Sequence, residues 1–133
     1  MAEINDLVLG HRIVVEKHIL PTEIHLSIDK KQIKKSLVNI LNNALESMEN
    51  YPKVLNISTI NDSGFYSILI EDNGKGISPD LEHQIFEPFF TTKKDAEGLG
   101  LTDAERSILA HNGNIIFKPQ EKGSLFVIQL PIN

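Results

Sequence analysis

A short acidic and glycine-rich stretch, EDNGKGI at residues 71–77, carries side chains that are well placed to bind a ligand. It continues a run of alternating apolar residues, and Asp72 has the same parity as Ile70, so a regular strand would turn both toward one buried layer. A buried carboxylate is costly without a partner, and it can accept a hydrogen bond from an amine on a ligand. Gly74 and Gly76 permit positive φ angles and the close approach of a flat ligand. The plainer interpretation is a strand that ends in an Asp-Asn-Gly turn.

Two asparagines on a predicted helix form a second candidate site. Asp29 is a suitable N-cap for a helix that continues to about Asn50. Asn39 and Asn43 are four residues apart, so they share a stripe beside the apolar face, and Glu46 continues the row. One carboxamide oxygen can ligate a hard cation such as Mg²⁺ while the other group positions phosphate or water, although a simple polar face is the alternative. We expect the apolar face to pack on a sheet. It consists of Ile33, Leu37, Ile40, Leu41, Ala44, Leu45 and Met48.

A second glycine-rich stretch, Gly98-Leu99-Gly100-Leu101, precedes a helix predicted from about Thr102 to His111. Glycines at this place expose the first backbone N–H groups of the helix, whose partial positive charge suits a phosphate group. Upstream, three of the six phenylalanines fall within Phe86-Glu87-Pro88-Phe89-Phe90, which is either a hydrophobic plug or part of a site. The polar segment 91–97 between these stretches is predicted to be mobile.

Length and composition limit the classes of protein to consider. A chain of 133 residues fits one domain, and the absence of cysteine excludes disulfides and fits a reducing compartment. The five histidines lack the close spacing of a metal site. A net charge of −5 without a basic cluster argues against binding of nucleic acid or membrane by this domain. The sequence contains no run of membrane-spanning length and no signal-peptide pattern.

The remaining elements follow from apolar spacing and turn residues. Residues 1–10 are expected to be the remnant of a linker helix, and residues 11–133 to form the domain. Ser78-Pro79-Asp80 has the composition of a further helix start. The expected fold is a two-layer α/β sandwich, with a mixed, mostly antiparallel sheet of about five strands covered on one face by about three helices. Strands are predicted at 11–17, 23–28, 54–60, 65–72, 114–117 and 124–130.

Taken together, these stretches resemble the ATP-binding catalytic domain of sensor histidine kinases, in the superfamily of gyrase-type, mismatch-repair and heat-shock-chaperone ATPases. The resemblance covers residues 3–131, with the boxes of the family in their usual order. Each box alone is a weak signal, whereas the ordered set is specific, and neither a P-loop nor a dinucleotide-binding glycine motif is present. The boxes are matched by Asn39-Ile40-Leu41-Asn42-Asn43-Ala44 (N box), Asp72, Gly74 and Gly76 (G1 box), Phe86-Glu87-Pro88-Phe89-Phe90 (F box), Gly98-Leu99-Gly100-Leu101 (G2 box) and Gly123 to Pro131 (final glycine and strand).

The resemblance implies the Bergerat fold and bound Mg-ATP. Asp72 would accept a hydrogen bond from the adenine amino group, and the loop around it would wrap the base. Asn43 would ligate Mg²⁺ with Asn39 nearby, and both would take part in catalysis. Residues 91–97 would form the lid over ATP, and Gly98 to Leu101 would offer amides to the β- and γ-phosphates. The implied nucleotide-binding residues are Asn39, Asn43, Asp72, Gly74, Gly76, Ile77, Phe86, Thr92, Lys93, Gly98, Leu99, Gly100 and Leu101.

The residue four positions before Asn43 distinguishes the subfamilies. Relatives that hydrolyse ATP or phosphorylate a serine usually carry glutamate there, whereas this chain has Asn39. An amide cannot act as a general base, so transfer to a nucleophilic imidazole fits better than hydrolysis. The resemblance implies a phosphoacceptor histidine on a separate helical domain, in the same protein or in another, and indirectly a response regulator. The isolated domain is expected to be monomeric and cytoplasmic, either free or as part of a membrane-anchored sensor.

Three residues depart from the pattern of the family. Ala96 and Glu97 stand where relatives with this type of lid usually have glycine and threonine, and Asp103 takes a helix position that is usually aliphatic. Ala96 resists a positive φ angle, and the two acids oppose a triphosphate unless Mg²⁺ or lysines offset them. Two alternatives therefore stay open. One is a non-catalytic regulatory module of the same fold, and the other is a stand-alone serine kinase of the anti-sigma type, which Asn39 and the F box disfavour.

Overall fold

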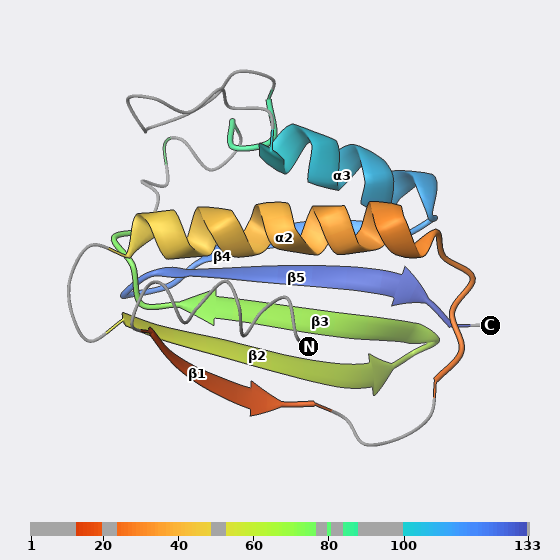
Figure 1. The fold of residues 1–133 in the computed structure, drawn as a ribbon, viewed down its shortest axis with the longest axis horizontal. Helices are drawn as coiled ribbons and strands as arrows, with labels where there is room; N and C mark the ends of the chain where they lie inside the picture. Colours follow the sequence, from red (N-terminus) through yellow and green to blue (C-terminus); the bar gives the residue numbers. More distant parts are fainter. Residues whose placement is uncertain are drawn as a thin grey trace.

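The computed structural model describes residues 13–19, 24–48, 53–76, 80, 84–87 and 100–132. Within these residues the chain forms five strands and two helices (Figure 1). The expected linker helix at residues 1–10 lies outside the described part, as does most of the helix expected from Ser78. The elements are β1 (Ile13–His18), α2 (Lys30–Ser47), β2 (Lys53–Asp62), β3 (Phe65–Asp72), α3 (Gly100–Ala110), β4 (Asn114–Pro119) and β5 (Ser124–Pro131).

All five strands join one sheet in the order β1-β2-β3-β5-β4. β1 pairs with β2 in parallel, and the other three strand pairs are antiparallel. The last strand of the chain, β5, therefore lies inside the sheet between β3 and β4 (Figure 1). This topology confirms the predicted mixed, mostly antiparallel sheet.

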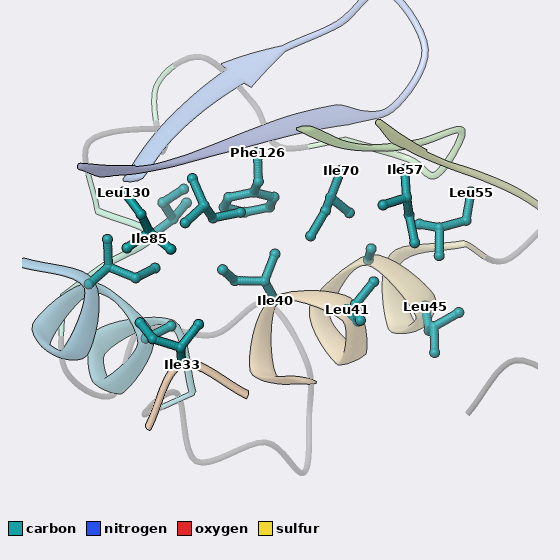
Figure 2. Close-up of a cluster of buried hydrophobic side chains, with 14 of the residues drawn as sticks. Ile33, Ile40, Leu41, Leu45, Leu55, Ile57, Ile70, Ile85, Phe126 and Leu130 are labelled. Carbon is teal, nitrogen blue, oxygen red and sulfur yellow. The ribbon is translucent and has the colours of Figure 1, made fainter. Parts of the chain in front are cut away.

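The two described helices lie together on one face of the sheet and form the second layer (Figure 1). The hydrophobic core fills the space between the layers. Figure 2 shows Phe126 and Ile70 of the sheet pointing toward Ile40 and Leu41 of α2, and all four residues are buried. The predicted two-layer sandwich is confirmed, although the described residues contain two helices where about three were expected.

The start of α2 follows from its capping residue. The Asp29 carboxylate accepts hydrogen bonds from the backbone N–H groups of Lys31 at 3.0 Å and Gln32 at 3.2 Å. Asp29 is therefore the N-cap that the sequence predicts. The helix ends at Ser47, three residues before the predicted end at Asn50. Its predicted apolar face packs on the sheet.

The prediction of a strand at residues 23–28 is wrong. Its described part, residues 24–28, has no regular secondary structure and does not join the sheet. The apolar alternation has another cause, because Leu26 and Ile28 pack against the core where the chain approaches α2. Alternate residues can thus be half-buried on a single extended segment without any strand pairing.

The boundaries of α3 are close to those predicted. The helix begins at Gly100, two residues earlier than expected, and ends at Ala110. Asn112 then adopts a positive φ of 60°, and the Gly113 N–H donates to the Ile108 carbonyl oxygen at 3.0 Å. This turn closes the helix and leads the chain into β4.

Candidate functional site

Asp72 is buried at the end of β3, on the same side of the sheet as Ile70, as the alternation predicts. Only 3% of its surface is exposed. Its Oδ1 atom accepts a hydrogen bond from the Gly74 N–H at 2.8 Å and lies 3.4 Å from the Ser47 hydroxyl oxygen. These contacts fix the carboxylate beside the C-terminal end of α2.

The surroundings of Asp72 raise its pKa from the ordinary 3.8 to about 6. The main cause is burial, because removal from water penalises the charged form, and the nearby charge of Glu71 adds to the effect. Hydrogen bonds from the Gly74 and Ser124 backbone and from the Ser47 side chain oppose it. A desolvated carboxylate of this kind gains more from an N–H donor on a ligand than an exposed carboxylate does.

Gly74 lies where the loop after β3 crosses the end of α2. A Cβ atom at this position would be 2.7 Å from the Ser47 carbonyl oxygen and 2.9 Å from Asp72 Oδ1, and it would also collide with the Ser47 hydroxyl. The Lys75 N–H donates to the same Ser47 carbonyl oxygen at 3.1 Å. Glycine is therefore needed at residue 74 for close packing. Of the two glycines, only Gly76 has the positive φ that the sequence suggested for both, at 72°.

The start of β5 packs on the loop that holds Asp72. Gly123 has a φ of 95°, and a Cβ atom there would collide with the Asp72 carbonyl oxygen. A Cβ atom on Gly76 would lie 3.0 Å from the Gly123 carbonyl oxygen. Residues Asp72 and Ser124 are partners in the β3–β5 pairing. Gly123, the final glycine of the chain, thus belongs to the Asp72 site. The predicted site did not include this residue.

A polar stripe on α2 consists of Asn39, Asn43 and Ser47. These residues are spaced four apart, and each is half-buried. At one end of the stripe Ser47 contacts Asp72. At the other end, a Cβ atom on Gly100 would lie 3.8 Å from the Cβ and Cγ atoms of Asn39. The stripe is about 12 Å long, so it joins the end of β3 to the start of α3.

The predicted continuation of this row at Glu46 needs correction. Glu46 is exposed, whereas Ser47 is half-buried and reaches Asp72. Sequence reasoning missed Ser47, although its four-residue spacing from Asn43 is the signal that could have identified it.

The first turn of α3 is tied to the phenylalanine-rich segment. The Thr102 hydroxyl donates to the Phe86 carbonyl oxygen at 2.8 Å, and the Phe86 ring lies edge-on to Phe126 with centroids 6.4 Å apart. Asp103 is in the same turn, and one of its carboxylate oxygens is 4.0 Å from the Arg106 guanidinium. The acid is therefore partly compensated within the helix.

The structure thus brings two groups of predicted residues to the two ends of the polar stripe. Asp72, Gly74 and Gly76 gather at one end, and Gly100 lies beside Asn39 at the other. Leu101 packs against the hydrophobic core. The predicted site residues outside the described part are Ile77, Thr92, Lys93, Gly98 and Leu99. Ala96 and Glu97, which differ from the pattern of the family, also lie outside it.

Comparison with protein families connects this arrangement with a known group. Residues 28–133 match the family described as histidine kinase-, DNA gyrase B- and HSP90-like ATPases. The chain belongs to this ATPase family. The matched region contains both ends of the polar stripe, so the described site lies wholly within the ATPase domain.

Relatives of this ATPase domain include sensor kinases. The sensor protein TdiS from Thauera aromatica is 34% identical over 128 residues, which are 92% of this chain and 23% of TdiS. The signal transduction histidine-protein kinase AtoS from Escherichia coli strain K12 is 38% identical over 109 residues, which are 81% of this chain and 18% of AtoS. The chain spans less than a quarter of the length of these two relatives.

Solved structures show the same fold. The nucleotide-free catalytic domain of histidine kinase ThkA has a TM-score of 0.85 and 25% identity, covering 98% of this chain and 86% of that one. ThkA in complex with the response regulator protein TrrA gives a TM-score of 0.83 at 23% identity, covering 99% of this chain and 38% of that one.

Neither helix of the described ATPase domain is both long and apolar enough to cross a membrane.

Proposed function

We propose that this ATPase domain binds Mg-ATP and transfers the γ-phosphoryl group to a histidine on a separate helical phosphoacceptor domain of a two-component sensor kinase. The observation that carries the proposal is the polar stripe of α2. It connects a buried carboxylate at one end with the N-terminus of a helix at the other. A purine amine suits the first end, and a phosphate chain suits the second. The sensor kinases among the relatives support this assignment.

The Asp72 end has the properties of an adenine site. Its carboxylate is desolvated and held by Gly74 and Ser47, so it is oriented before a ligand arrives. Gly74 and Gly76 pack the loop closely on Ser47 and Gly123, which holds the loop in place around the carboxylate. We assign to Asp72 the recognition of the adenine amino group.

The Gly100 end has the properties of a phosphate site. The first backbone N–H groups of α3 have no partners within the helix, and the helix dipole adds partial positive charge. The Asn39 carboxamide lies beside this helix start. We assign the β- and γ-phosphates to this end, with Lys93 and Thr92 of the predicted lid as further contacts.

Mg²⁺ would enter this site together with the nucleotide. Among the described residues, no group of three or more His, Asp or Glu side chains could hold a metal ion. Asn43 supplies one carboxamide oxygen, and Mg²⁺ commonly takes its remaining ligands from phosphates and water. The stripe therefore fits a metal that arrives with ATP, where it would neutralise phosphate charge.

We assign the phosphoryl acceptor from the absence of a general base on the polar stripe of α2. Asn39, Asn43 and Ser47 carry no carboxylate, so none of them can take a proton from water or from a serine hydroxyl as a general base. An imidazole is already nucleophilic and needs positioning only. A histidine-bearing helical phosphoacceptor domain, in the same protein or in another, is therefore the proposed partner. A response regulator is the proposed next acceptor, as ThkA is seen with one.

A regulatory module of the same fold that does not bind ATP is the second candidate. Asp103 favours it, because this residue places a carboxylate in the first turn of α3, where it opposes a phosphate. Arg106 offsets part of this charge. Ala96 and Glu97 are further reasons from the sequence.

The first test is a calorimetric titration of the chain with a non-hydrolysable ATP analogue, with and without Mg²⁺, beside Asp72→Asn. We expect micromolar-to-millimolar binding that weakens in the variant. The second test supplies ATP and a histidine-bearing helical domain and looks for acid-labile phosphohistidine. Absence of binding at millimolar nucleotide would overturn the proposed kinase and favour the regulatory module. Acid-stable phosphoserine on a protein substrate would support the serine kinase.

A further inference from the structure

His111 follows the last residue of α3, and its imidazole bridges the two helices. Its Nε2 atom is 3.0 Å from the backbone nitrogen of Asp29, the N-cap of α2, and its Nδ1 atom is 2.7 Å from the Ser107 carbonyl oxygen. A backbone N–H can only donate, and a carbonyl oxygen can only accept. Both bonds therefore require a neutral His111 ring with its hydrogen on Nδ1.

This bridge lies at one end of the interface between α2 and α3. Gly100 and Asn39 lie beside each other at the other end, since a Cβ atom added to Gly100 would be 3.8 Å from Asn39 Cβ. Asn39 comes ten residues after Asp29, and Gly100 comes eleven residues before His111. At the rise of a helix, both segments are about 15 to 17 Å long, which agrees with the antiparallel course of the two helices in Figure 1.

We infer that His111 is a positioning residue for the phosphate end of the nucleotide site. In its neutral Nδ1–H form it fixes the end of α3 to the start of α2, and this sets the place of Gly100 against Asn39. The inference rests on the proposed function, in which the first N–H groups of α3 bind phosphate. His111 lies about 16 Å along α3 from these groups and would act on them by holding the helix in place.

Loss of the bridge should move α3 without unfolding it. Ala104 and Ile108 are fully buried in the core, and the Thr102 hydroxyl still bonds to Phe86. A helix held by these contacts keeps its fold, but its C-terminal end loses the directional bond that fixes it against Asp29. Substitutions at His111 are therefore informative in a folded chain.

Three variants separate positioning from general stability. His111→Gln keeps an acceptor at the place of Nε2, whereas His111→Phe removes both hydrogen bonds. Gly64→Ala is the matched destabilised control, because Gly64 has a φ of 85° in the β2–β3 turn with nothing within 4 Å of an added Cβ. Affinity for a non-hydrolysable ATP analogue with Mg²⁺ is measured at a temperature where circular dichroism shows every variant fully folded.

We expect His111→Phe to bind the analogue about fivefold more weakly, the equivalent of roughly one neutral hydrogen bond. His111→Gln should retain most of the affinity, and Gly64→Ala all of it. Equal affinities for His111→Phe and the wild type would overturn the inference, and so would an equal loss in His111→Phe and Gly64→Ala.

Nuclear magnetic resonance tests the bridge without nucleotide. The ¹⁵N shifts of the His111 ring should show the Nδ1–H tautomer at neutral pH, and His111→Phe should shift the amide signals of Gly100 and Leu101. A ring with its hydrogen on Nε2, or unchanged amide signals in His111→Phe, would overturn the inference. A wild-type chain that binds no nucleotide would overturn the proposed function instead, and these signals would still decide whether His111 sets the place of α3.

Discussion

Gly74 and Ser47 pack so closely that no side chain fits between them. An added Cβ atom on Gly74 would lie 2.7 Å from the Ser47 carbonyl oxygen. The Ser47 hydroxyl in turn lies 3.4 Å from Asp72 Oδ1. The end of α2 and the loop after β3 therefore form one packed unit, and the orientation of the site carboxylate depends on the smallest residue in it.

Gly74→Ala tests this packed unit. The added methyl group must push the loop away from α2, which we expect to lower the free energy of unfolding by about 1–3 kcal/mol and to weaken nucleotide binding. Denaturant unfolding and calorimetry measure the two effects. Gly64→Ala is the control, since it costs about 1–2 kcal/mol through its positive φ and lies far from the site. A variant at Gly74 that binds nucleotide as well as this control does would contradict the prediction.

Asp72 should make stability depend on pH. Its pKa is about 6 in the folded state against an ordinary 3.8, so in that window the folded chain holds a proton that the unfolded chain has released. The free energy of unfolding contributed by Asp72 is therefore greatest below the ordinary pKa and falls as pH rises through about 6, by a total of about 3 kcal/mol.

Urea unfolding at a series of pH values, compared with Asp72→Asn, isolates this contribution. The wild type should lose stability relative to the variant as the pH rises through the window. Asp62→Asn, at an exposed position in the β2–β3 hairpin, should keep the wild-type dependence. Parallel curves for the wild type and Asp72→Asn would show that burial does not shift this carboxyl group.

Asn43→Ala should reduce the Mg²⁺ dependence of nucleotide binding. The variant loses the one carboxamide oxygen assigned to the metal, so we expect Mg²⁺ to strengthen nucleotide binding much less than it does in the wild type. Asn42→Ala is the matched control, because Asn42 is also half-buried but lies about 100° around the helix from Asn43. Titrations in Mg²⁺ and in chelator measure both variants. If Asn42→Ala has the larger effect, the stripe has been assigned to the wrong face of α2.

Asp103→Asn should strengthen nucleotide binding several-fold at low salt. Removal of a carboxylate from the first turn of α3 reduces its repulsion of phosphate, and the gain should shrink as salt screens the charge. Glu105→Gln removes the same charge from the same helix at a position about 200° away. An identical gain from both variants would attribute the effect to net charge and not to the location of Asp103.

Local patterns in the sequence were enough to predict much of the fold. Capping chemistry located Asp29, because a carboxylate at that position satisfies nearby N–H groups whatever the rest of the chain does. Strand parity placed Asp72 on the buried side for the same kind of reason. The segment 24–28 shows where local patterns fail. Leu26 and Ile28 alternate with polar residues as in a strand, but they pack against the core without pairing in the sheet.

The site was harder to predict, because its contacts join residues that are distant in the chain. Ser47 contacts Asp72 and Gly123 packs on the Asp72 backbone, and neither contact follows from local spacing. The bond between His111 and Asp29 spans 82 residues. Such contacts depend on how the layers are assembled, which periodicity alone does not determine.

β5, the last of the five described strands in sequence order, takes part in the packing around Asp72 at the end of β3. β5 lies between β3 and β4, so before its synthesis β3 has an open edge and β4 has no neighbour. Pairing Asp72 with Ser124 closes a loop of 52 residues, a slow and non-local step in folding. A chain in which β5 has not yet paired therefore lacks the packing of Gly123 on the Asp72 backbone, and nucleotide bound at the proposed site would report that this pairing has formed.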